Sequence, residues 1–137
     1  MNRQRWYLVY WGLSLAFFGA AALNVLHVRA GFFTNHLADV VVPAWLYVIA
    51  RSLQPGGRRT SFMARTVGRT PARAALSILA ASTITELCQR SWPHGLFPGR
   101  FDPYDLVAYG VGIGAVYLAE KSRHPSASDV TDHSSRA

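Results

Sequence analysis

Residues 6–26 read WYLVYWGLSLAFFGAAALNVL, an uninterrupted apolar run without a charged side chain. A helix needs about 20 such residues to cross the hydrocarbon core of a bilayer. Arg3 and Arg5 precede the run, and the aromatic residues at its start suit the headgroup level of a membrane. The small residues at 19–22 leave a cleavable signal peptide as the alternative. Because the apolar run continues past them, the sequence favours a retained transmembrane helix.

Three further apolar stretches follow the first one. Their lengths and the short polar segments between them predict an all-α membrane protein with a single domain over residues 1–121. We expect four transmembrane helices, at about 6–26, 37–53, 72–89 and 103–120. Residues 122–137 show no apolar periodicity and predict a disordered tail.

Each of the three later stretches has a feature that needs a neighbouring helix. Pro43 interrupts the second, and a membrane helix tolerates proline where neighbours satisfy the freed carbonyl. The third carries Ser, Thr and Glu86, which are typical either of a half-buried soluble helix or of a packed membrane interface. The fourth contains Gly110 and Gly114, a small-xxx-small spacing that permits close approach of helices, including those of a second copy.

The basic residues indicate the orientation. Of the 14 lysines and arginines, 11 fall on one side of a four-span arrangement, in the N-terminal segment, the 54–71 connection with its flanks, and the tail. The positive-inside rule then places both termini in the cytoplasm and predicts a multi-pass protein of the cell membrane. The three on the other side are Arg29, Arg90 and Arg100.

Composition excludes several other classes. The net charge of +7 and the pI near 10.3 are compatible with nucleic-acid binding, but the arginines flank apolar segments instead of alternating with aromatic residues. We therefore expect membrane lipids as partners and no nucleic acid. Cys88 is the only cysteine, so an internal disulfide is impossible and no cysteine pattern for metal is present. We expect neither a metal nor a cofactor.

Four of the seven acidic residues fall at the predicted extracytoplasmic ends of helices. A charge within a span costs about 2.5–3.5 kcal/mol on insertion scales, so such groups usually face a partner or a watery cavity. Helical spacing places Glu86 and Gln89 on one face of the third helix and Asp102 and Asp105 on one face of the fourth. Asp39 lies near the start of the second helix. These residues are predicted to converge.

Two interpretations of this convergence are open. In the structural one, Glu86 and Asp105 pair with Arg90 or Arg100, and Asp102 caps the helix that Pro103 begins. In the functional one, an outward-facing polar pocket receives a lipid or sugar headgroup, or a catalytic water. No catalytic motif is present, so no catalytic residue is assigned. The candidate binding residues, with Arg100 as the contact for an anion, are Asp39, Glu86, Gln89, Arg100, Asp102 and Asp105.

Residues 86–89 (ELCQ), 97–105 (FPGRFDPYD) and 110–114 (GVGIG) together resemble the VanZ-like family of small membrane proteins. The resemblance covers about residues 82–118 and rests on a Glu-x-x-Gln helix end, a loop with glycine, proline and arginine, an acidic pair, and a glycine-containing helix. The chain departs from the family pattern at Tyr109, where asparagine is common. The stretch 35–39 also lacks the Lys-x-x-His type of helix start.

The resemblance implies a role in the cell envelope, since the family is named for a protein associated with resistance to a glycopeptide antibiotic. We therefore expect a protein that binds an envelope lipid or a cell-wall precursor headgroup and affects antibiotic susceptibility. One alternative is a membrane-embedded hydrolase or transferase with Glu86 and Asp105 as acid and base. Another is a structural or transport subunit that acts as a homo-oligomer through Gly110 and Gly114.

Overall fold

The structure is a computed structural model that describes residues 3–26, 32–57, 62–92 and 101–122. All regular structure in these ranges is helical, which confirms the predicted all-α class. The elements are α1 (Arg3–Val25), α2 (Phe32–Ala50), the short α3 (Phe62–Thr66), the 3-10 turn η1 (Val67–Arg69), α4 (Pro71–Ser91) and α5 (Pro103–Lys121).

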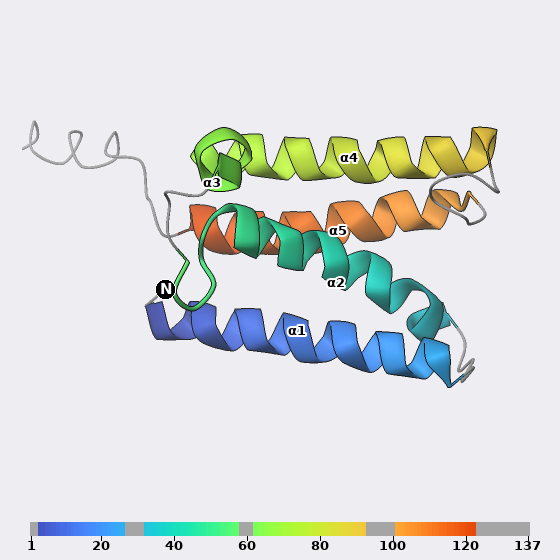
Figure 1. Ribbon diagram of the computed structural model, residues 1–137, viewed down its shortest axis with the longest axis horizontal. Coiled ribbons are helices and arrows are strands. Elements are labelled where there is room, and N and C mark those ends of the chain that lie inside the picture. Colours follow the sequence, from blue (N-terminus) through green and yellow to red (C-terminus); the bar gives the residue numbers. More distant parts are fainter. Residues whose placement is uncertain (1–2, 27–31, 58–61, 93–100, 123–137) are drawn as a thin grey trace, which may run out of the picture.

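The four long helices lie side by side and alternate in direction (Figure 1). The start of α1, the connection between α2 and α4, and the end of α5 therefore lie at one end of the bundle. The start of α2, the end of α4 and the start of α5 lie at the other end. Four long helices are thus present as the apolar runs predicted, and their crossing of a membrane stays a prediction. The predicted tail falls almost wholly outside the described residues.

Helix α2 is the centre of the packing, because it contacts α1, α4 and α5, and α4 also contacts α5. Its Tyr47 and Val48 are fully buried in a core that includes Trp6 of α1. Trp45 joins α2 to α1 in two ways: its ring stacks on Phe17 at 5.7 Å, and its Nε1 donates to Ser14 Oγ at 3.1 Å. The first helix is thus an integral part of the core.

Helices α2 and α5 approach each other closely at Gly112. A Cβ atom on Gly112 would lie 2.0 Å from the carbonyl oxygen of Val40, so only glycine fits there. A Cβ atom on Gly110 or Gly114, the two glycines that the sequence singled out, would meet no neighbouring atom within 4 Å. Close helix contact within the chain therefore uses the glycine between them. Their use between two copies of the chain stays a prediction.

The described part of the connection between α2 and α4 contains two short helical elements where the sequence predicted a loop. Helix α2 ends at Ala50, before the predicted 53, because Ser52 adopts a φ of 54° that a helix cannot continue. α3 and η1 then fold back on the end of α2. A Cβ atom on Gly68 would lie 1.8 Å from the Ala50 carbonyl oxygen, so this return also requires glycine.

Among the described helices, Gln4–Leu23 in α1 is long and apolar enough to cross a membrane, and a shorter apolar stretch covers His36–Ala50. Only 17% of the first stretch is buried, whereas the apolar core helix of a soluble protein is mostly buried. Length and composition thus support one of the four predicted spans.

Candidate functional site

Three polar side chains meet where α2 and α5 begin. His36 and Asp39, three residues apart, share one face of α2, and Asp105 lies in the first turn of α5. His36 Nδ1 lies 2.8 Å from Asp105 Oδ1 and 3.9 Å from Asp39 Oδ2. The Asp39 carboxyl group also lies beside that of Asp105 and experiences its charge. All three side chains are partly exposed.

Glu86 of α4 completes this group from the inner side. Tyr109, one turn after Asp105 in α5, donates its hydroxyl to Glu86 Oε1 at 2.7 Å. The Glu86 residue is only 2% exposed, and its Oε2 has no hydrogen-bond partner among the described residues. Burying a carboxylate oxygen without a hydrogen-bond partner costs free energy, so a partner for Glu86 Oε2 is expected. We call His36, Asp39, Glu86, Asp105 and Tyr109 the acidic cluster.

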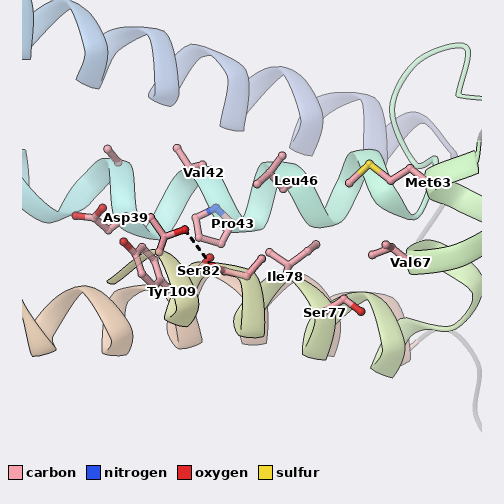
Figure 2. A pocket seen from close by; sticks show the side chains of 13 residues that line it. Asp39, Val42, Pro43, Leu46, Met63, Val67, Ser77, Ile78, Ser82 and Tyr109 are labelled. Atoms are coloured by element: carbon pink, nitrogen blue, oxygen red, sulfur yellow. Dashed lines mark hydrogen bonds between the residues drawn. The ribbon is translucent and has the colours of Figure 1, made fainter. Parts of the chain in front are cut away.

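A cavity of about 410 Å³ extends from the acidic cluster along the space between α2 and α4. Figure 2 shows Asp39 and Tyr109 together at one end of it and Met63 and Val67 at the other. Between these ends the wall is mainly apolar and includes Pro43 and Ile78. We call this cavity the groove. The groove has a long apolar wall and a polar end, so it is complementary to an amphiphilic ligand.

The structure brings together Asp39, Glu86 and Asp105, as the sequence predicted. The predicted role of Asp102 as a helix cap is confirmed, because its Oδ1 accepts from the Tyr104 backbone N–H at 2.9 Å. Gln89 is half-buried and makes no side-chain hydrogen bond to another described residue. Arg100, the predicted contact for an anion, lies outside the described residues.

The expected structural pairing with Arg90 is wrong. The Arg90 guanidinium lies 5.6 Å from the centre of the Phe101 ring. Cation–π attraction holds it there. His36 pairs with Asp105 instead, and the Tyr109 hydroxyl donates to Glu86. Helical spacing contained both signals, since His36 precedes Asp39 by three residues and Tyr109 follows Asp105 by four.

A second buried polar group, which the sequence did not reveal, lies at the opposite end of the bundle. Arg51 Nε lies 3.0 Å from both carboxylate oxygens of Glu120, and Arg51 Nη1 donates to the Gly68 carbonyl oxygen. Tyr47 donates its hydroxyl to Glu120 Oε2 at 2.6 Å. We call Tyr47, Arg51 and Glu120 the ion-pair cluster. Arg51 had counted only as an orientation signal, and Glu120 as the end of a helix.

Three residues at the mouth of the acidic cluster are close enough to hold a metal ion. His36, Asp102 and Asp105 each offer a ligand atom, and these atoms lie within 4.8 Å of one another. Nitrogen and carboxylate oxygen suit a borderline or hard divalent cation. Two of the three already have other roles, because Asp102 caps α5 and Asp105 pairs with His36. The geometry would admit a metal ion, and nothing else in the described residues requires one.

No family model, curated protein or solved structure matches this chain. The resemblance to the VanZ-like family therefore stays a hypothesis carried by residues 82–118.

Proposed function

We propose that this chain is a four-span membrane protein of the cell envelope that binds an amphiphilic envelope lipid in the groove, with the lipid headgroup at the acidic cluster. The groove itself carries the proposal. Its volume of about 410 Å³ falls within the range of about 300–1,000 Å³ that is common for small-ligand sites. Its wall is apolar for most of its length and becomes polar at Asp39 and Tyr109.

The distribution of side chains supports four spans. The long helices have 19 to 23 residues, or about 28–35 Å at 1.5 Å per residue, and the hydrocarbon core of a bilayer is about 30 Å thick. Large apolar side chains cover the outside of the bundle, while Arg51, Glu86 and Glu120 are buried inside it. This arrangement suits lipid surroundings, and the exposed apolar side chains on the long helices include Leu8, Trp11, Leu15, Phe18, Leu76, Ile84, Val107, Val111 and Leu118.

We place the groove's polar end on the outer side. The acidic cluster lies at the end of the bundle opposite the start of α1 and the end of α5, and the positive-inside rule assigns that opposite end to the cytoplasm. The VanZ-like resemblance adds an envelope role and an effect on antibiotic susceptibility to this proposal. Its residues Glu86, Asp102 and Asp105 lie at that same end.

Binding is better supported than catalysis. A hydrolase or transferase would need Glu86 and Asp105 to reach one reacting group. Tyr109 instead holds one oxygen of Glu86, which is almost wholly buried, and His36 holds Asp105. A role as a structural or transport subunit rests on the open Gly110 and Gly114 positions and stays a prediction.

The topology is tested with single cysteines in a background in which the exposed Cys88 is replaced by alanine. A membrane-impermeant thiol reagent applied to intact cells should label a cysteine at Gly95 but not one at Gly57 or Ser128. Lysed cells provide the control in which all three react. Labelling of Gly57 and Gly95 from the same side would refute the four-span arrangement.

Lipid binding is tested by native mass spectrometry of the purified full chain, with a matched pair of variants. Ala81→Trp fills the groove, whereas Ala80→Trp adds the same bulk at an exposed neighbouring position outside it. We expect a co-purified lipid that Ala81→Trp displaces and Ala80→Trp retains. Equal lipid occupancy in both variants would show that the groove is not the binding site.

A further inference from the structure

The acidic cluster has a surplus of negative charge. Three carboxyl groups, those of Asp39, Glu86 and Asp105, face one another closely enough to interact electrostatically. In the described part of the chain, His36 pairs with Asp39 and Asp105, and no arginine or lysine pairs with any of the three. Like charges in a poorly hydrated site repel strongly. A cation in this place would relieve the repulsion.

Glu86 supplies an independent sign of a missing partner. Its side chain is almost wholly buried, and Oε2 has no partner among the described residues although Oε1 is held by Tyr109. A buried carboxylate is normally paired or binds a cation. Glu86 lies against the Tyr109 hydroxyl, and the Tyr109 ring forms the wall of the groove beside Asp39 (Figure 2). Glu86 itself is not among the described residues that line the groove, so its charge acts on the groove's polar end from behind Tyr109.

The groove limits which cation fits. A free ion needs no apolar wall, but this cavity continues from Asp39 past Pro43 to Met63. A ligand that satisfies both parts has a hydrocarbon body and a positively charged end. The Tyr109 ring adds a face for cation–π attraction at the place where that charge would lie.

We propose that the occupant of the groove is a membrane lipid with a cationic amine headgroup, held by Asp39 beside Tyr109, with Glu86 adding negative charge from behind Tyr109. This inference rests on the proposed function and adds the charge of the ligand to it. It also reverses the expectation of an anionic headgroup bound by Arg100. Charge complementarity is the reason, because a phosphate at the polar end of the groove would meet the Asp39 carboxyl group and lie near those of Glu86 and Asp105.

The test uses three lipids with the same two oleoyl chains: a cationic one (dioleoyl trimethylammonium propane), a neutral one (dioleoylglycerol) and an anionic one (dioleoyl phosphatidylglycerol). The full chain in dodecyl maltoside is titrated with each lipid, and bound lipid is counted by native mass spectrometry. We expect the cationic lipid to bind at least tenfold more tightly than the other two. Glu86→Gln and Asp39→Asn should each weaken it about tenfold, whereas Asp129→Asn, which removes the same charge outside the described helices, should not.

The outcomes separate the two proposals. Equal binding of the cationic and neutral lipids, or no effect of either Glu86→Gln or Asp39→Asn, overturns the charge inference and leaves lipid binding in the groove intact. Tightest binding of the anionic lipid, with or without added Mg²⁺, overturns it in favour of an anion site. If none of the three lipids binds and none co-purifies, both the inference and the proposed function fail.

Discussion

The two polar clusters at opposite ends of the bundle use similar residues for different results. In the ion-pair cluster, one arginine meets one glutamate, and a tyrosine hydroxyl and the Gly68 carbonyl oxygen complete the set. The charges cancel, and all three side chains are buried. In the acidic cluster, Asp39 and Asp105 share His36, Tyr109 donates to one oxygen of Glu86, and the other, buried oxygen of Glu86 has no described partner.

The difference separates a structural role from a binding role. A buried pair that satisfies both charges joins the helices it connects, here α2 and α5, and loses stability when one member is removed. A surplus of like charge does not favour folding, and in the proposed function it serves the binding of a ligand. Four variants test this contrast, from the largest expected effect on stability to the smallest.

Glu120→Gln should have the largest effect, because it leaves the buried Arg51 charge without its counter-charge. Breaking a buried pair in this way costs about 3–5 kcal/mol. The measurement is the shift of the unfolding midpoint of the chain in non-ionic detergent. The double variant Arg51→Met with Glu120→Gln, which removes both charges, should regain part of the loss. If Glu120→Gln alone is as stable as the double variant, the Arg51–Glu120 pair does not stabilise the fold.

Gly112→Ala should destabilise by about 1–3 kcal/mol, since the added methyl group meets the Val40 carbonyl oxygen and forces α2 and α5 apart. Gly110→Ala is the matched control in open space, where alanine should be neutral or stabilising by up to about 1 kcal/mol. Unfolding midpoints of the two variants are compared under identical conditions. If Gly110→Ala is less stable than Gly112→Ala, the close contact between α2 and α5 is not at Gly112.

Asp102→Ala should destabilise by about 1 kcal/mol, because α5 loses the side-chain cap on the Tyr104 backbone N–H. Asp102→Asn removes the charge but keeps an oxygen that can accept the same bond. We expect its unfolding midpoint to match that of the unchanged protein. An Asn variant as unstable as the Ala variant would show that charge, not capping, is what Asp102 supplies.

Glu86→Gln should have the smallest effect on stability, with an unfolding midpoint unchanged or raised, because it relieves repulsion among the three carboxyl groups. Binding of the cationic lipid should nevertheless weaken about tenfold, and any envelope phenotype under antibiotic stress should be lost. This is the usual separation between stability and activity at a site. If the variant unfolds at lower temperature and still binds lipid fully at matched expression, Glu86 belongs with Glu120 as a structural residue.

Local patterns of sequence predicted much of this molecule. Apolar runs placed the four long helices within a few residues of their observed bounds. Helical spacing predicted the faces of α4 and α5 on which Glu86 and Asp105 lie, and the Asp-Pro pair at 102–103 predicted the cap of α5. Each of these depends on residues a few positions apart in the chain, where backbone geometry alone decides which side chains share a face.

The partners across helices could not be predicted in the same way. Arg51 and Glu120 are 69 residues apart, and so are His36 and Asp105, so nothing local distinguishes these pairs from other pairs of opposite charge. Likewise, the spacing of Gly110 and Gly114 suggested a contact, while the rotation of α5 against α2 placed Gly112 there instead.

The sequence by itself therefore determined the helices, their alternating order and the end at which acidic residues gather. Only the tertiary structure decided which charges cancel and which remain in surplus. The physical reason is that charge pairing falls off within a few ångströms in a packed interior, and the helix rotations that set those distances result from packing over the whole bundle.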